Sequence, residues 1–232
     1  MAIPQAGNVV LGGSLAGTTV QFGTTTLPGV PLVENAFVAK MSAQGSWLWA
    51  VCSGNRSGRV ALGAAGNVYC TGNFVGASLF GSFALTANGL QDEYVGKLDP
   101  AGTWLWVRST GGLGYEYAAG VGVDYAGNVL VAGGFGVPSA TFGTLTIPNR
   151  GGGNFDAYVV KLDANGNFLW AEGMSGTDND VAKVWPWTIG AGSTPPVFTA
   201  GSALGLGRLP WWVTLGPTPV FWPRWATARL RK

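Results

Sequence analysis

Residues 156–170 read Asp156-Ala-Tyr-Val-Val-Lys-Leu-Asp-Ala-Asn-Gly-Asn-Phe-Leu-Trp170. The same pattern occurs twice earlier, as Asn35-Ala-Phe-Val-Ala-Lys-Met-Ser-Ala-Gln-Gly-Ser-Trp-Leu-Trp49 and Asp92-Glu-Tyr-Val-Gly-Lys-Leu-Asp-Pro-Ala-Gly-Thr-Trp-Leu-Trp106. Each copy places two short runs rich in β-branched and aromatic residues on either side of a polar turn, which predicts a β-hairpin. In the middle copy the turn is Asp99-Pro-Ala-Gly102, where proline presets φ and glycine can adopt the left-handed conformation that follows a type I turn.

Two further blocks recur in step with this hairpin. One begins Ala-Gly-Asn-Val and occurs at residues 6–13, 65–72 and 126–133, and a Phe-Gly pair occurs at residues 22–23, 80–81 and 142–143. The Ala-Gly-Asn blocks contain the turn of a second hairpin, and the Phe-Gly pair predicts a small extra hairpin between the two main ones. The period of roughly 60 residues indicates a repeat architecture.

The repeat predicts an all-β fold. Two main hairpins per copy give about four antiparallel strands, which is the plan of a β-propeller blade. We therefore expect propeller blades, in an incomplete or open propeller, with turns at Gly45, Gly66, Gly102, Gly127 and Gly166. A β-solenoid or a sandwich is the alternative, but solenoid repeats are usually shorter. No window has a helical period flanked by caps.

The chain divides into two regions at Lys183. Residues 1–183 hold nearly three full copies from a mid-repeat start, and residues 184–232 form a Trp- and Pro-rich tail. No acidic residue follows Asp180, whereas six of the eleven Trp and seven of the thirteen Pro lie after Lys183. In a reading frame that starts one nucleotide earlier, the codons of Val184-Trp-Pro-Trp-Thr188 are compatible with the sequence of the strand that the repeat predicts at this position. The tail is thus either a frameshifted fourth repeat or a degenerate final blade, and the gene sequence distinguishes the two.

Composition excludes several partner classes. A net charge of +2, with no cluster of Lys and Arg before the last few residues, argues against nucleic acid. No uninterrupted apolar run reaches the length of a membrane span. The first residues, Met1-Ala-Ile-Pro-Gln5, have neither the basic region nor the apolar core of a signal peptide.

Catalytic chemistry is not indicated. The chain has no histidine, which removes the usual general base and every Ser-His or Cys-His nucleophile pair. Most acidic residues recur at equivalent turns, where turn capping explains them better than catalysis. Asp163-x-Asn165-x-Asn167 and Asp178-x-Asp180 resemble calcium loops but lack the remaining ligands. We therefore predict no catalytic residue, no metal and no cofactor, and we leave the binding residues unassigned.

Two repeated side chains have a functional and a structural interpretation. The lysines could form a basic ring, but covering a strand or pairing with a nearby Asp is the better explanation. The tryptophans could stack on sugars, but an inter-blade core is the better explanation. These residues are Lys40, Lys97 and Lys161, and Trp49, Trp106 and Trp170.

The motifs resemble those of a known family. The pattern Gly-x-Gly-x-Glu-x-Ala-x-Gly-Val-x-Val-Asp-x-x-Gly-Asn-Val at residues 112–129, together with residues 156–170, resembles the bacterial seven-bladed β-propeller repeat family (SBBP-type repeats). The resemblance covers roughly residues 6–183. It implies a propeller in a secreted or cell-surface protein, with no shared catalytic residues. This chain departs from the family in having too few copies for a closed seven-bladed ring, and in its tail.

These observations favour a non-catalytic structural or ligand-binding propeller module of a larger secreted or cell-surface protein. Its partners would be an unknown protein or glycan and further blades of the same protein. One alternative is an enzyme similar to the quinoprotein dehydrogenases, whose blades also end in an Asp-x-x-x-Gly-x-x-Leu-Trp-like hairpin. Another is a lectin-like propeller that binds sugars through exposed Trp.

Overall fold

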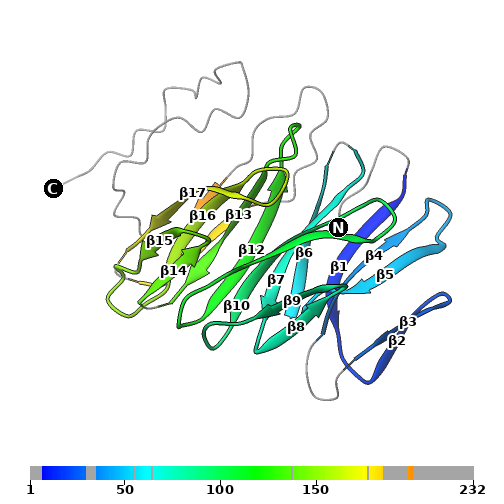
Figure 1. Ribbon diagram of the computed structural model, residues 1–232, viewed down its shortest axis with the longest axis horizontal. Helices are drawn as coiled ribbons and strands as arrows, with labels where there is room; N and C mark the ends of the chain where they lie inside the picture. The colour runs from blue at the N-terminus through cyan, green and yellow to red at the C-terminus, as the bar shows by residue number, and fades with distance from the viewer. Residues whose placement is uncertain are drawn as a thin grey trace.

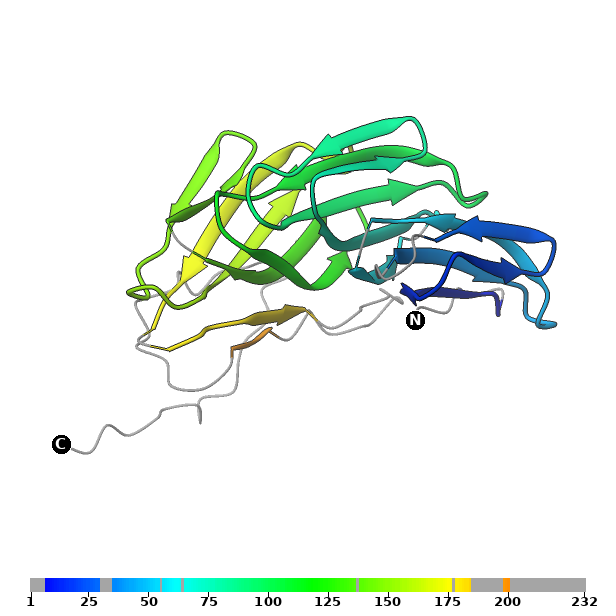
Figure 2. The same cartoon turned by 90° about the horizontal axis from the view of Figure 1, so that it is seen from below.

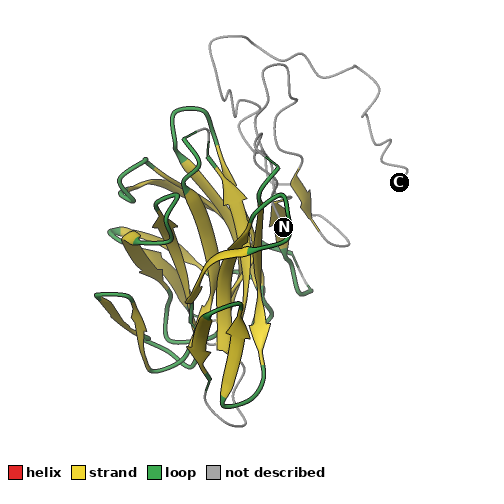
Figure 3. Ribbon diagram, turned by 90° about the vertical axis from the view of Figure 1, so that its right-hand side faces the viewer, coloured by secondary structure: helices red, strands yellow, loops and turns green. Residues whose placement is uncertain are grey.

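The computed structural model describes residues 7–29, 35–54, 56–63, 65–136, 138–176, 178–184 and 198–200. All regular secondary structure in these ranges is β-strand, as Figure 3 shows. Every pair of strands is antiparallel. None of these residues belongs to a helix of the length and apolarity needed to span a membrane.

Three main sheets stand side by side in chain order (Figure 1). The first sheet contains β1 (Val9–Leu15), β4 (Asn35–Met41) and β5 (Trp47–Cys52). The second sheet contains β6 (Arg56–Leu62), β7 (Val68–Phe74), β10 (Asp92–Leu98) and β11 (Trp104–Thr110). The third sheet contains β12 (Glu116–Val123), β13 (Val129–Phe135), β16 (Asp156–Leu162) and β17 (Phe168–Met174). The second and third sheets confirm the predicted four-stranded unit, and the first sheet has the last three strands of that unit.

A two-stranded hairpin is inserted between the second and third strands of each unit. These hairpins join β2 (Thr19–Phe22) to β3 (Thr25–Pro28), β8 (Ala77–Phe80) to β9 (Phe83–Thr86), and β14 (Ser139–Phe142) to β15 (Leu145–Pro148). Each turn begins directly after the Phe of a Phe-Gly pair, and its Gly has positive φ. The predicted extra hairpin is therefore confirmed in all three copies.

The main turns follow from their residues. All five glycines predicted at turns have positive φ, between 76° and 89°. In the turn after β10, one carboxylate oxygen of Asp99 accepts the backbone N–H groups of Ala101 and Thr103, at 2.9 and 2.8 Å. These hydrogen bonds stabilise the ionised form, so the pKa of Asp99 lies below its usual value. The interpretation of the repeated acidic residues as turn caps is confirmed here.

The core lies between the sheets. Buried side chains of the second and third sheets, such as Val95, Trp106, Val131 and Tyr158, form one cluster. A second cluster joins the first sheet to the second and includes Val38. Because each sheet buries one face against its neighbour, an isolated sheet of this repeat would expose its apolar side chains to water.

The start of another unit lies beside the third sheet. β18 (Ala182–Val184) pairs with β19 (Phe198–Ala200), and β18 contacts β12, β13 and β16 (Figure 2). The remaining tail residues, 185–197 and 201–232, lie outside the described residues. The predicted boundary at Lys183, and the frameshifted or degenerate repeat over 184–232, therefore stay predictions.

Candidate interaction surface

A pair of side chains repeats in all three sheets and joins the first sheet to the second and the second to the third. The Lys of the third strand and the Trp of the fourth strand are direct cross-strand partners in all three sheets: Lys40 with Trp49, Lys97 with Trp106, and Lys161 with Trp170. Opposite residues in an antiparallel pair point to the same face with their Cβ atoms about 5 Å apart. A register shift directly after each Lys is also common to the three hairpins. We call this pair of side chains the Lys–Trp clamp.

The clamp of the first sheet binds the second sheet through one carbonyl group. Lys40 Nζ donates a hydrogen bond to the Pro100 carbonyl oxygen at 3.1 Å, and Trp49 Nε1 donates to the same oxygen at 3.0 Å. Pro100 belongs to the turn between β10 and β11. The indole ring lies under this turn, since a Cβ added to Gly102 would come within 2.7 Å of the Trp49 ring.

The clamp of the second sheet repeats this arrangement on the third sheet. Lys97 Nζ and Trp106 Nε1 both donate to the Ala164 carbonyl oxygen, at 3.2 and 3.1 Å. A Cβ at Gly166 would lie 2.8 Å from the Trp106 ring. Two features therefore require glycine at the last position of this turn. Its φ is +80°, and the neighbouring indole occupies the space that a side chain would take.

The clamp of the third sheet is open within the described residues. Lys161 Nζ lies 3.7 Å from a carboxylate oxygen of Asp124 in its own sheet. Trp170 is partly exposed, and its indole N–H has no hydrogen-bond partner there. The third sheet therefore presents the same two donors as the other sheets, without the turn that they bind.

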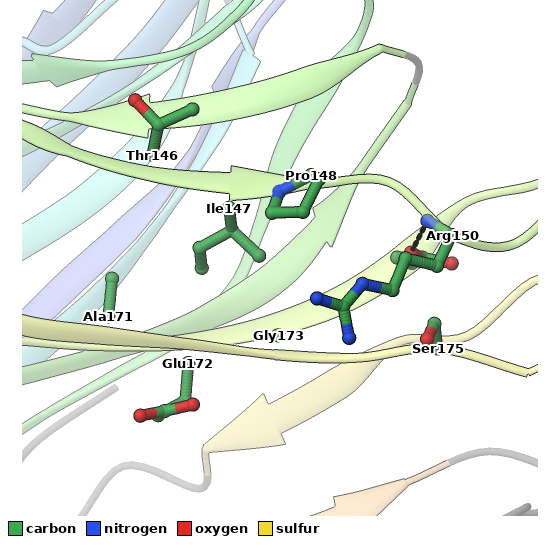
Figure 4. A pocket seen from close by; sticks show the side chains of 9 residues that line it. Thr146, Ile147, Pro148, Arg150, Ala171, Glu172, Gly173 and Ser175 are labelled. Carbon is green, nitrogen blue, oxygen red and sulfur yellow. Dashed lines mark hydrogen bonds between the residues drawn. The ribbon is translucent and has the colours of Figure 1, made fainter.

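A shallow hollow of about 220 Å³ lies near this open clamp. It is bordered by β15 and β17, and Arg150 and Glu172 lie on opposite sides of the β17 ribbon (Figure 4). In the second sheet, the end of the corresponding strand, β11, is covered. There, Gly111 follows β11, and Thr141 lies in the small hairpin of the third blade. The two residues exchange two backbone hydrogen bonds, at 3.1 and 3.2 Å.

The equivalent turn of the first sheet is not held by a clamp within the described residues. Ser42, Ala43, Gln44 and Gly45 join β4 to β5 and correspond to the turns that the other two clamps bind. Gly45 is exposed with φ +84°, and no atom lies within 4 Å of the position that its Cβ would take. The counterparts Gly102 and Gly166 are both buried. Within the described residues, the Lys161–Trp170 clamp binds no turn, and the turn at residues 42–45 is bound by Asn8 of its own blade, at 3.2 Å, rather than by a clamp.

The structure refines the interpretations of the repeated Lys and Trp. The predicted inter-blade core is correct for Trp106, which is 6% exposed. Trp49 and Trp170 are only partly buried, so the expectation that all three are largely buried is wrong. The Arg108 guanidinium lies 5.8 Å from the Trp106 ring and covers it, whereas Val51 takes the place of Arg108 beside Trp49. Lys40 and Lys97 bind backbone carbonyls of the next sheet rather than carboxylates.

The sequence analysis did not single out the carboxyl group of Glu93. Glu93 is fully buried between sheets, where Ala36 and Ala157 occupy the equivalent positions. Thr71 Oγ1 lies 2.8 Å from Glu93 Oε1 and 2.6 Å from the Tyr94 carbonyl oxygen. A hydroxyl has one proton, so both contacts are satisfied when a neutral Glu93 carboxyl donates to Thr71 and Thr71 donates to Tyr94.

Burial explains why Glu93 is neutral. Desolvation raises its pKa to about 8, although hydrogen bonding of the ionised carboxylate with Thr71 and Thr110 opposes the shift. Desolvation also raises the pKa of the neighbouring Glu116 to about 7, with a further contribution from Asp92. The carboxyl group was detectable in the sequence, because Glu93 breaks the pattern of its repeat position.

The calcium-like segments do not gather ligands in the described chain. Asp163 accepts hydrogen bonds from the backbone of Asn165 and from the backbone and side chain of Asn167, which is turn capping. No group of three or more Cys, Asp and Glu side chains is placed to hold a metal ion in the part of the chain that the structure describes.

Comparisons with known proteins bear on the fold. No family model matches this chain. A stretch of 103 residues, 43% of the chain, is 27% identical to an uncharacterised WD repeat-containing protein of Acanthamoeba polyphaga mimivirus. WD repeats build propeller blades of four-stranded sheets. These sheets are propeller blades. The blades of this chain form an open run, and the match spans 7% of the length of the viral protein.

Proposed function

We propose that this chain is a non-catalytic structural and ligand-binding module, a run of propeller blades within a larger secreted or cell-surface protein. The observation that carries the proposal is the use of the repeated polar side chains. The Lys–Trp clamps bind the backbone of the next blade, and the repeated Asp residues cap turns. Residues that occur once per blade therefore build the fold, which leaves the loops for recognition.

The larger context rests on two resemblances. The repeat motifs resemble the bacterial seven-bladed family, which supports a secreted or surface location. The partial relative is much longer than this chain, since the match spans 7% of its length. Both support a module whose further blades belong to the same protein.

An exposed apolar patch supports a protein ligand. Leu90, Leu113 and Tyr115 are each at least half exposed. They lie on two adjacent loops, which are held together by the hydrogen bond from the Leu90 N–H to the Gly114 carbonyl. Grouped apolar side chains on a surface are typical of protein-binding sites.

The gene sequence on either side of this chain tests the module. We expect further in-frame copies of the Lys-x8-Trp hairpin and an upstream signal peptide. A gene that encodes neither would contradict the proposal.

Two binding experiments test the alternatives. Titration with pyrroloquinoline quinone and calcium should give no absorbance spectrum of a bound quinone, because no group of three or more Cys, Asp and Glu side chains in the described blades is placed to hold the calcium ion. Saturable quinone binding would favour the dehydrogenase. Binding on a glycan array that is lost in Trp170→Ala would instead favour a sugar-binding propeller.

A further inference from the structure

The small hairpins of the three blades differ in the side chains that face outward (Figure 1). On the β8–β9 hairpin, the inward side chains Phe80, Phe83 and Leu85 pack against the core cluster of the first two sheets. Its outward side chains are Ala77, Leu79, Ala84 and Thr86. The corresponding positions are Thr19, Gln21, Thr26 and Pro28 in the first blade, and Ser139, Thr141, Thr146 and Pro148 in the third. The hairpin of the second blade therefore has an apolar outward face where the other two have Ser, Thr, Gln and Pro.

The surroundings of this face are also apolar and uncharged. Leu79 is 71% exposed, and Val75, which lies just before β8, is 43% exposed. No Asp, Glu, Lys or Arg occurs in the sequence between Arg59 and Asp92. An exposed hairpin that is apolar and uncharged lacks the features that keep a sheet edge from pairing with another chain.

Strand β9 has a free edge that carries hydrogen-bonding groups. Among the described strands, β9 pairs with β8 alone. The Ala87 N–H donates to the Gly76 carbonyl oxygen at 2.9 Å, and bonded pairs alternate with non-bonded pairs along an antiparallel ladder. The backbone groups of Thr86 and Ala84 therefore point away from β8, toward the free edge.

Proline removes the equivalent donor from the other two small hairpins. Gly29 and Asn149 donate to their partner strands as Ala87 does, so Pro28 and Pro148 occupy the place of Thr86. Proline has no N–H, and on edge strands it prevents pairing with another chain. Among the three described hairpins, the one in the second blade therefore keeps this donor.

The third blade shows that such outward-pointing groups do pair when a partner is present. Thr141 corresponds to Leu79 and lies at a non-bonded position of its own hairpin. Its N–H and carbonyl exchange two backbone hydrogen bonds with Gly111 of the preceding blade. The edges of these hairpins are thus suited to strand pairing.

We propose that two copies of this chain pair edge to edge through β9, antiparallel and across a two-fold axis. With Leu85 of the two copies opposite each other, Thr86 of each copy lies opposite Ala84 of the other. Each of these two residue pairs exchanges two backbone hydrogen bonds. The two hairpins then form one continuous sheet with an apolar outward face. This interface goes beyond the proposed function, and either can fail without the other.

The chemistry of the edge favours a second copy as the partner. A strand can pair antiparallel with an identical strand about a two-fold axis, which gives a closed dimer. Because the hairpin has no charged side chain, this pairing brings no like charges together. β9 has four residues, so the interface is smaller than that of a standard stable complex and the dimer is weak.

Sedimentation velocity tests the dimer. We expect the mass of the full chain to rise from monomer to dimer as its concentration increases from about 1 μM to about 1 mM. A chain that stays monomeric over this range would overturn the proposal and would leave the edge to a different protein.

Thr86→Pro tests the edge. It gives the second hairpin the proline that the other two have, and it removes no hydrogen bond between β8 and β9, because the Thr86 N–H points to the free edge. We expect dimerisation to weaken about 10-fold or more, since two of the four backbone hydrogen bonds between the copies are lost.

Thr86→Val is the matched control, because it changes the side chain but keeps the N–H and a β-branched residue. It should dimerise like the wild type. Circular dichroism establishes that both variants are folded. If folded Thr86→Pro associates as strongly as the wild type, another surface joins the copies and the proposal fails.

Amide exchange measured by NMR locates the interface. The backbone amides of Ala84 and Thr86 should exchange more slowly at high protein concentration than at low concentration, because they are hydrogen-bonded in the dimer. Thr26 is the internal control, since it corresponds to Ala84 in the first blade and its amide also points to a free edge. Its exchange should not depend on concentration. Equal protection of Thr26 and Ala84, or a dimer without protection of Ala84 and Thr86, would overturn the proposal.

Discussion

Glu93 makes the second blade sensitive to pH. Its pKa is raised to about 8 by burial, whereas the pKa of Glu in an unfolded chain is near its usual value of 4.5. Below the unfolded pKa both states are protonated, and the stabilising effect of the neutral carboxyl is complete. As pH rises toward 8, only the unfolded state releases its proton, so the folded state loses stability.

We expect Glu93→Gln to reduce this pH dependence. Gln is neutral at every pH and can donate to Thr71 as the protonated Glu does. Urea unfolding should show that the wild type loses stability between about pH 4.5 and pH 8, and that the variant loses less. The control is Asp178→Asn at an exposed carboxyl. Equal pH dependence in the wild type and Glu93→Gln would contradict a buried neutral carboxyl.

Trp106 is the best-buried of the three repeated indoles. Trp106→Ala removes both its ring from the junction and its hydrogen bond to the Ala164 carbonyl. Large-to-small core substitutions of this kind cost about 3 kcal/mol or more. Leu105→Ala is the control, since Leu105 is 46% exposed on the neighbouring position of β11. Similar unfolding free energies for the two variants would show that the clamp contributes little.

The hairpin between β16 and β17 depends on its neighbour as well as on its own turn. Gly166 and Gly45 have nearly equal φ values, +80° and +84°, but only Gly166 has an indole ring in the space of a side chain. Gly45→Ala should therefore show only the backbone cost of the left-handed conformation, about 1–2 kcal/mol.

Gly166→Ala adds a clash with Trp106 to the same backbone cost. We expect it to be less stable than Gly45→Ala by a further 1–3 kcal/mol, roughly the cost of overpacking a core. Chemical denaturation of the two variants measures this difference. Equal losses of unfolding free energy in the two variants would mean that the junction accommodates the added methyl group at no cost. In a Trp106→Ala background the clash is absent, so Gly166→Ala should lose less stability there than in the wild type.

The position of each blade in the row sets its stability. In a repeat array a blade is stabilised by its own fold and by its nearest neighbours. The second blade has a described neighbour on both sides, whereas the first has one neighbour and three strands. The junctions, rather than the separate hairpins, therefore control the stability of the whole.

Hydrogen exchange should reveal this gradient. We expect backbone amides of β7 and β10 to exchange more slowly than those of β1 and β4, since local opening is easiest where neighbours are fewest. Mass spectrometry of peptides from both blades measures the rates. Uniform protection across the blades would indicate one cooperative unit instead.

Much of the fold is already present in short segments of the sequence. The Asp-x-x-Gly turns, the Phe-Gly hairpins and the flanking runs rich in β-branched and aromatic residues predicted three repeated units correctly, because hairpins depend on residues that are close in the chain. The pairing of Lys97 with Trp106 is different, because these residues lie two positions before and four positions after the turn at residues 99–102, and a register shift between Lys97 and Leu98 brings them opposite each other.

The junctions were not predictable from the same patterns. Trp49 and Lys40 find the Pro100 carbonyl, and Glu93 becomes neutral, only when sheets some 60 residues apart are stacked against one another. The sequence shows three identical clamps, so it cannot distinguish the two that are filled from the one that is open. That difference arises from the stacking, because a donor is satisfied or left free by whichever blade lies beside it.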